Sequence, residues 1–407
     1  MSAAQDARDP EDPLVEQTKL MTDHLNWTAK QGYILTGGGK AEEYYTAERG
    51  FPFVETDLPH YHLLQGDTHT TFSKWKSSQQ PPCKLVCGAW NRPLFTGGWK
   101  HSTDQEEEVY NIQTHNLFVD LRIPKSRNAV LPPDCTSLQE LTPYQLRLFA
   151  RQHVFAGFTV CSEENGKPLA TRHHCIDWNF VGVSRPRPNK WWIQFPKESN
   201  DNDKSSSDCS KWKELAYAKD DWGQHYYFER WERYPRGIDD EGGRLAIRLA
   251  SSRKRKSTDG TDSTDAHSRP CDQPKDGILV LVGDHFNYIT SRAFSGKETA
   301  YPPSTVSSLV QLVDEAVAQG DLDTARSYLS VEAGHGTVSS GWKLDCTIPP
   351  WNKGRTLSET MGGGPTFVEG PDLASCSILW NGENWELYDC SFGTIDELQK
   401  LFEGISK

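Results

Sequence analysis

The stretch Val109–Pro124, VYNIQTHNLFVDLRIP, decides the fold. In an extended chain, one side of it carries Leu117, Val119, Leu121 and Ile123. The other side carries Phe118, Asp120 and Arg122. This period of two is typical of a half-buried antiparallel strand, and Pro124 ends the strand because proline has no backbone N–H to donate. Later segments repeat the pattern, so we predict a mainly β protein with antiparallel barrels built on this strand.

Length and charge bound the class of protein. The chain has 407 residues, which is long for one core and favours two domains. Its net charge of −12 argues against a nucleic-acid binder, which would carry a basic face. No apolar run reaches the roughly 18 residues that span a bilayer, and the acidic start is unlike a targeting peptide. We therefore expect a cytoplasmic protein without nucleic-acid or membrane partners.

Composition divides the chain into two barrels with accessory segments. We expect a flexible lead at 1–25, a first barrel at 26–235 and a second barrel at 236–407. The basic and Ser/Thr/Asp-rich segment 251–274 predicts a disordered insertion. Apolar residues recur at helical spacing in 304–330, which predicts a helical insertion in the second barrel.

Local signals add a few short helices and one close contact. Thr142 and Pro143, followed by Gln145, have the pattern of an N-cap, a first-position proline and a capping glutamine. The segment 394–397, TIDE, is a capping box that predicts a terminal helix. Gly157, within an extended stretch, permits another backbone to approach closely.

Cysteine and histidine spacing predicts neither a disulfide framework nor a metal site. The chain has 10 cysteines without a secretory signal, so we expect most of the thiols to be reduced and structural. His60, His62 and His69 fall on an irregular segment, which favours a polar loop over a zinc site. The sequence contains no dinucleotide fingerprint and no phosphate loop. We therefore predict no metal and no cofactor.

Five pieces of sequence, taken in their order, suggest a family. They are LFVDLRIP (117–124), HHCIDW (173–178), YFERWERY (227–234), ILVLVGDHFNYI (278–289) and NGENWELYDCS (381–391). In this order the chain resembles the fungal casein-kinase-interacting family of double lipocalin-like proteins and its uncharacterised bacterial relatives. The resemblance implies two adjoining lipocalin-like β-barrels. It also implies an interaction role, although 251–274 and 304–330 depart from the compact fungal pattern.

The segment 172–178 is the best candidate for chemistry. On a regular strand, Arg172, His174, Ile176 and Trp178 share one face, and His173, Cys175 and Asp177 share the other. A His–Cys–Asp face can supply a base, a nucleophile and an orienting carboxylate. Neighbours two apart on one strand usually lie too far apart for a direct triad, so we favour a barrel-lining polar patch or a solvated face. His174 is kept as a catalytic candidate.

Aromatic and charged residues supply candidates for ligand binding. Trp178, Tyr226 and Trp231 can line a cavity for a flat apolar ligand, and they can equally fill a solid core. Arg233 lies in a strand of alternating charge, where it forms either a surface ion pair or a contact with a ligand carboxylate. His285 lies within a hydrophobic strand and must find partners or face a cavity, which makes it a second catalytic candidate.

Two functions remain open at this point. The first is a protein that encloses a small, mainly apolar molecule in a barrel and holds it or steers its isomerisation or cyclisation. The second is a non-enzymatic interaction scaffold with solid barrels, which binds a protein partner through insertions such as 251–274. Within that insertion, the basic run Arg253–Lys256 is either a nuclear localisation signal or a solvent-exposed cluster of charge in a loop. Whether the protein is an enzyme is left open.

Overall fold

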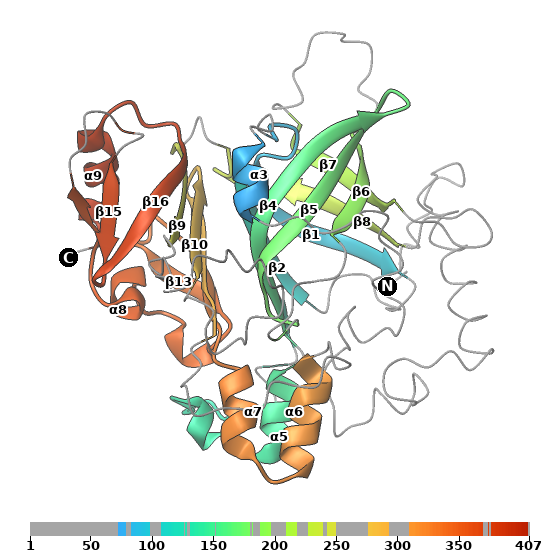
Figure 1. Ribbon diagram of the computed structural model, residues 1–407, viewed down its shortest axis with the longest axis vertical. Helices are drawn as coiled ribbons and strands as arrows, with labels where there is room; N and C mark the ends of the chain where they lie inside the picture. Colours follow the sequence, from blue (N-terminus) through green and yellow to red (C-terminus); the bar gives the residue numbers. More distant parts are fainter. Residues whose placement is uncertain are drawn as a thin grey trace, which may run out of the picture.

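The fold is seen in a computed structural model of the whole chain (Figure 1). The structure describes residues 72–78, 83–97, 107–125, 127, 131–150, 152–179, 181, 188–196, 209–217, 227–238, 242–249, 276–292, 309–368, 373 and 376–405. The predicted lead 1–25, the insertion 251–274, Tyr226 and the three histidines His60, His62 and His69 lie outside the described residues. Among the described residues, no helix has the length and apolar character that a membrane span requires.

The first half of the fold is a closed antiparallel barrel of eight strands. Its strands are β1 (Gly88–Gly97), β2 (Glu107–Gln113), β3 (Leu117–Pro124), β4 (His153–Glu164), β5 (Lys167–Asp177), β6 (Asn189–Gln194), β7 (Lys211–Ala216) and β8 (Tyr227–Arg233). Each strand pairs with the next in sequence, and β8 returns to β1, with Phe95 opposite Glu229. The organising strand is β3, and it ends at Pro124 as its sequence predicts.

The second half is an antiparallel sheet of eight strands. Its strands are β9 (Arg244–Leu249), β10 (Gly277–Val282), β11 (His285–Thr290), β12 (Glu332–Thr337), β13 (Lys343–Thr347), β14 (Thr366–Val368), β15 (Ser377–Trp380) and β16 (Glu383–Cys390). They are ordered β13-β12-β11-β10-β9-β16-β15-β14. The mainly β class is thus confirmed, with one difference. The second unit is a sheet with two ends, because β13 and β14 do not pair with each other in the part of the chain that the structure describes.

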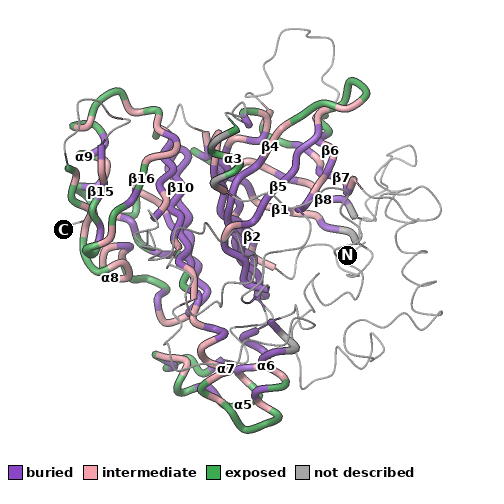
Figure 2. The backbone as a smooth tube through the Cα atoms, in the orientation of Figure 1, coloured by how far each residue is buried: buried purple, intermediate pink, exposed green. Residues whose placement is uncertain are grey.

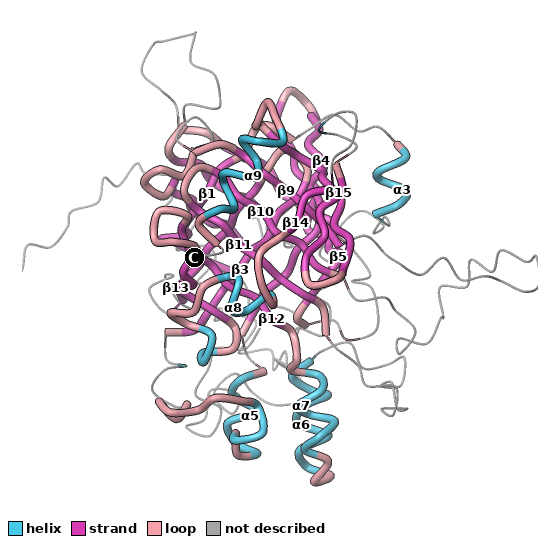
Figure 3. Tube along the Cα trace, turned by 90° about the vertical axis from the view of Figure 1, so that its left-hand side faces the viewer, coloured by secondary structure: helices cyan, strands magenta, loops and turns pink. Residues whose placement is uncertain are grey.

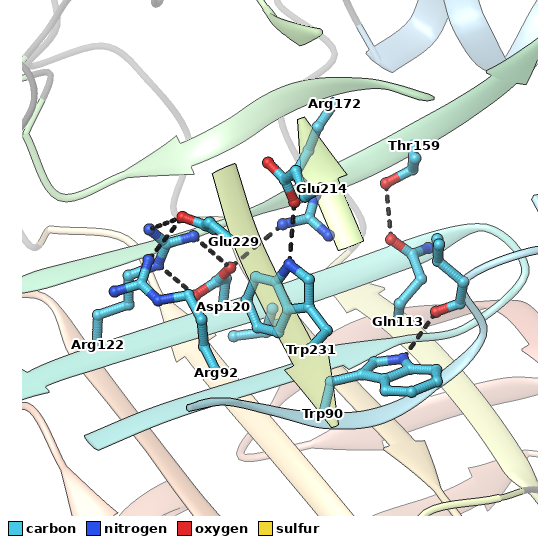
Figure 4. Close-up of polar contacts among 12 residues, drawn as sticks. Trp90, Arg92, Gln113, Asp120, Arg122, Thr159, Arg172, Glu214, Glu229 and Trp231 are labelled. Atoms are coloured by element: carbon cyan, nitrogen blue, oxygen red, sulfur yellow. Dashed lines mark hydrogen bonds and ion pairs between the residues drawn. The ribbon is translucent and has the colours of Figure 1, made fainter. Parts of the chain in front are cut away.

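The organising strand is buried on both of its faces, not half-buried as its alternation indicates. Its aliphatic side chains join a core with Ile278, Val280 and Ile289 of the second sheet. Its Asp120 and Arg122 point to the opposite side, into the barrel (Figure 4). The second sheet packs on the outer, aliphatic side of β3. The polar side, for which the alternation alone indicates solvent, faces the interior of the barrel. Figure 2 shows buried strands on both sides of this contact, around β10 in the second sheet and around β2 and β4 in the barrel.

Short helices lie below the strands and over the second sheet. Figure 3 shows α5 (Pro143–Phe149), α6 (Leu309–Ala318) and α7 (Leu322–Tyr328) grouped together beyond one end of the strands. The predicted capping box of Thr142 with Gln145 is present, and Asp321 caps α7. The other helices within the described residues are α3 (Phe72–Ser77), η4 (Leu138–Glu140), η8 (Pro350–Asn352), α8 (Leu357–Met361) and α9 (Ile395–Glu403).

Two arginines, the buried Arg127 and the partly buried Arg292, join the units by binding backbone carbonyl groups. Arg127, between the barrel strands β3 and β4, donates to the carbonyl oxygens of Thr347 and Ile348 at 2.6 and 2.9 Å. Arg292, after β11, donates to the carbonyl oxygen of Asp177 at 3.1 Å and to that of Trp178. Each arginine therefore satisfies acceptors that packing has removed from water.

One pair of cysteines differs from the expectation of reduced thiols. Cys83, ahead of β1, forms a disulfide with Cys161 of β4, across a sequence separation of 78 residues. The other cysteines of the described residues are Cys87, Cys135, Cys175, Cys209, Cys346, Cys376 and Cys390. The pair is invisible in the sequence because folding alone brings these two positions together, with a Cα–Cα distance of 5.2 Å.

Candidate functional site

The interior of the closed barrel is lined by charged, amide and aromatic side chains (Figure 4). Strand pairing places them on one face, since Asp120 lies opposite Phe155, and Glu214 lies opposite Glu229. The buried polar residues on this inward face include Arg92, Asn111, Gln113, Asp120, Arg122, Thr159, Arg172, His174, Glu214 and Glu229. Such a lining is costly for a core that only holds strands together, because each charge must be removed from water.

Asp120 of β3 is the centre of an ion-pair network. Its side chain is 0% exposed, and its two oxygens accept from Nε and Nη2 of Arg122 at 2.9 and 3.1 Å. Arg172 of β5 adds a third contact, from Nη1 at 3.2 Å. Burial acts to raise the pKa of Asp120, but the neighbouring arginines outweigh burial and hold it below the usual range. The carboxylate is therefore ionised inside the barrel.

Glu229 of β8 is the second buried acceptor. Its Oε1 accepts from Nη1 of Arg92 at 2.7 Å and from Nη1 of Arg122 at 3.4 Å. Arg92 also donates through Nη2 to Glu107 of β2 at 2.7 Å. The network therefore runs across β1, β2, β3 and β8 and continues through Asp120 to β5. Removing one partner from a buried pair of this kind typically costs about 3–5 kcal/mol.

Arg172 is bound on one side only. It is 2% exposed and contacts Asp120 through Nη1, while its Nε and Nη2 have no hydrogen-bond partner among the described residues. Its guanidinium lies over the rings of Phe118 and Trp191, at 4.1 and 4.9 Å from their centroids. Burial lowers the pKa of Arg172, and the carboxylates of Asp120 and Glu214 oppose that shift.

A tryptophan cluster occupies the same interior. The rings of Trp212 and Trp231 stack at 5.7 Å, and Trp90 meets Trp212 edge to face at 6.0 Å. Trp231 donates its indole N–H to Oε2 of Glu214 at 3.2 Å. The indole N–H groups of Trp191 and Trp212 have no acceptor within the described part of the chain. The interior thus combines flat apolar surfaces with buried donors.

A bulge in β5 brings His174 and Asp177 together. Gly157 of β4 pairs with His174 and Ala156 pairs with Ile176, so Cys175 is an extra residue in the ladder. As a result His174 Nδ1 lies 2.5 Å from Oδ2 of Asp177. The face assignment predicted for a regular strand is therefore wrong for Asp177. A histidine oriented by a carboxylate in this way is suited to proton transfer.

The predicted ligand-binding residues are divided between the barrel interior and the core between the units. Trp231 lies in the barrel, and Arg233 lies over the ring of Trp90 at 4.8 Å. Trp178 lies beyond the bulge, in the core between the units, where its indole N–H donates to the carbonyl oxygen of Ala150 at 2.9 Å.

His285 lies at the contact between the barrel and the second sheet. It stacks on Tyr234 at 5.1 Å and on His335 at 5.4 Å, and His335 stacks on Tyr110 at 4.0 Å. His335 also pairs through Nδ1 with Oδ1 of Asn287 at 2.9 Å. Burial and the proximity of His285 hold the pKa of His335 well below 6.5. No group of three metal-binding side chains occurs among the described residues.

Sequence reasoning missed Arg92 and did not place Arg122 inside the barrel, although it named Arg172 and Arg233 among the candidates. Asp120 and Arg122 are visible as the polar side of β3, but the alternation alone indicates solvent on that side. Arg92 and Glu229 lie 137 positions apart, and only closure of the barrel brings them together. Their charged character within otherwise apolar strands was the available signal.

Comparisons with known proteins add little to this picture. No family model matches the chain, and no curated protein matches it. A solved structure of an uncharacterised protein from Saccharomyces cerevisiae is similar over 75% of this chain and 99% of that chain. Its sequence identity is 13% and its TM-score is 0.37, which is too low to carry an argument. The family resemblance seen in the sequence therefore stays a prediction.

Proposed function

We propose that the closed barrel β1–β8 binds a small, mainly apolar molecule among its tryptophan and phenylalanine rings. The observation that carries the proposal is the buried interior of Figure 4, where ion pairs and indole donors stand in place of an aliphatic core. A core of packed aliphatic residues usually gives equal or greater stability than buried ion pairs. Folding alone does not require this costly lining, whereas binding of a ligand would account for it.

Native mass spectrometry of the purified protein tests the proposal, by looking for a co-purifying small molecule. Trp231→Leu is expected to remove that molecule or to change which one is bound. The matched control is Trp385→Leu, since Trp385 is 1% exposed in the second sheet and Trp231 is 0% exposed in the barrel. Trp385→Leu is expected to lower stability and to leave the bound molecule unchanged. A wild-type protein that carries no small molecule and also binds none of the flat aromatic probes offered to it would contradict the proposal.

We infer further that His174 steers an isomerisation or cyclisation by moving a proton on the bound molecule. The contact of His174 Nδ1 with Asp177 supports this role, because a carboxylate partner stabilises the protonated ring. The other ring nitrogen takes a proton from one carbon and returns it to another, while the double bond shifts, so no oxidant is consumed. In heavy water, wild type is expected to place deuterium in the ligand, and His174→Gln is expected to bind the ligand without this exchange. Equal exchange in both proteins, or none in either, would remove the role.

The interaction scaffold remains a second candidate because the second sheet is filled. Trp342, Trp380 and Trp385 are buried against Phe402 of α9 in one apolar cluster. A sheet with a solid inner face suits a supporting role. Deleting 251–274 is expected to abolish capture of a protein partner if this function holds, and to leave ligand binding intact if the barrel proposal holds.

A further inference from the structure

The open side of Arg172 identifies the chemistry of the ligand. The side-on edge of a guanidinium, formed by Nε and Nη2, presents two parallel N–H groups that match the two oxygens of a carboxylate. In Arg172 both of these nitrogens are without a partner among the described residues, although the side chain is 2% exposed. Leaving two donors of a buried cation unpaired is costly, which indicates that an acceptor completes the site.

Two other arginines in this chain show what that edge binds. Arg122 uses Nε and Nη2 to hold both oxygens of Asp120, at 2.9 and 3.1 Å. Arg248 uses the same two atoms to hold both oxygens of Asp276, at 2.9 and 2.6 Å. Arg172 differs because its contact with Asp120 is made by Nη1 at 3.2 Å, which leaves the bidentate edge available.

The surroundings of Arg172 favour a flat molecule next to that edge. Its guanidinium lies over Phe118 at 4.1 Å and over Trp191 at 4.9 Å. Trp191 also has an indole N–H without an acceptor among the described residues. Both rings face the barrel interior, where an aromatic or conjugated body can stack beside them.

We propose that the ligand of the barrel carries a carboxylate on a flat apolar body, and that the carboxylate accepts hydrogen bonds from Nε and Nη2 of Arg172. This inference rests on the proposed ligand-binding function and names the class of ligand. The carboxylate of Glu214 opposes binding of a ligand carboxylate, because it interacts with Arg172 and carries the same negative charge as the ligand. Its Oε2 accepts from the indole N–H of Trp231. Neutralising Glu214 is therefore expected to tighten carboxylate binding.

Calorimetric titration with matched pairs of probes tests the inference. The probes are benzoate, 2-naphthoate and anthracene-2-carboxylate, each compared with its neutral carboxamide. At least one carboxylate is expected to bind about tenfold or more tightly than its carboxamide, as a charge-assisted bidentate contact provides. Arg172→Lys is expected to lower this ratio severalfold, because an ammonium group keeps the positive charge but cannot reproduce the parallel N–H pair. Glu214→Gln is expected to raise the ratio.

Two features separate a lost contact from a damaged fold. The ratio of two probes in one protein does not change when part of the sample is unfolded. Arg248→Lys is the matched control, since it removes a bidentate pair with Asp276 outside the barrel interior and is expected to keep the wild-type ratio. The inference would be overturned if a carboxylate and its carboxamide bound equally well, or if Arg172→Lys left the ratio of their affinities at the wild-type value. Either result would leave ligand binding itself intact.

Chemical modification of the co-purifying molecule tests the inference independently of the probe titrations. Methyl esterification increases the mass of a molecule that has a carboxyl group and does not change the mass of a molecule without one. A shifted mass supports the inference, and an unshifted mass overturns it even if no probe binds. Absence of both a co-purifying molecule and any probe binding would overturn the proposed function itself, and this inference with it.

Discussion

Replacing Asp120 by asparagine is expected to destabilise the protein strongly without making a cavity. The change keeps the size and shape of the side chain but removes its negative charge. The carboxylate oxygens of Asp120 accept from Arg122 at 2.9 and 3.1 Å and from Arg172 at 3.2 Å. The NH₂ group of the new amide would also face the N–H groups of these arginines, and two donors cannot form a hydrogen bond with each other. Because the site is fully buried, water cannot replace the lost partner, and we expect a loss of about 3–5 kcal/mol in the free energy of unfolding.

Urea unfolding followed by tryptophan fluorescence measures this loss. The control is Asp323→Asn, which removes a carboxylate that pairs with Arg326 at 2.9 Å but has a side chain that is 95% exposed. That variant is expected to unfold at the wild-type urea concentration, because solvent screens exposed pairs. If Asp120→Asn and Asp323→Asn changed stability equally, the buried network would be structurally unimportant, and the reasoning about the barrel would fail.

The pH dependence of the same variant gives a second check. The pKa of Asp120 is lowered in the folded protein, so the unfolded state binds its proton first as pH falls. The stabilisation is therefore complete above about pH 4, the pKa of an unfolded aspartate, and is lost as pH falls towards the folded pKa. Asp120→Asn should lack this contribution to acid unfolding.

Three further predictions concern other parts of the fold. The lowered pKa of His335 means that stability is complete above about pH 6.5 and declines below it, so His335→Gln should flatten the fall in unfolding free energy between about pH 6.5 and 5. Gly157→Ala should abolish folding or cost several times more stability than Gly393→Ala, as measured by thermal unfolding. The new Cβ at position 157 would lie 2.0 Å from the carbonyl oxygen of His173, whereas a Cβ at position 393 would meet its nearest atom at 3.5 Å. Reducing the Cys83–Cys161 disulfide should lower the free energy of unfolding by about 2–4 kcal/mol, with no effect of reductant expected in the Cys83→Ser, Cys161→Ser double variant.

The sequence predicts regular elements well because their signals are local. The alternation of β3, the end at Pro124 and the capping box of Thr142 depend on neighbours in the chain, and the structure confirms all three. The close backbone approach predicted at Gly157 is confirmed as well. The helices α6 and α7 fall within the segment 304–330 that has helical spacing.

The candidate site was less accessible because it depends on long-range closure. One extra residue, Cys175, changes which side chains after it face the barrel, and no local signal marks that bulge. It separates Trp178 from His174, although their positions have the same parity. The ion pairs of Arg92 and Arg122 with Glu229 require β1, β3 and β8 to meet around the barrel. Alternation shows that β3 has a polar side, but it does not show whether that side meets water or other charges.

The double burial of β3 makes the two halves of this chain mutually dependent. Its aliphatic side belongs to a core that also contains Ile278 and Val280, and its polar side belongs to the barrel network. Cutting the chain between the units would expose a continuous aliphatic stripe on each fragment. The isolated barrel would thus be prone to aggregate, and heat should melt the intact chain in a single step rather than half by half.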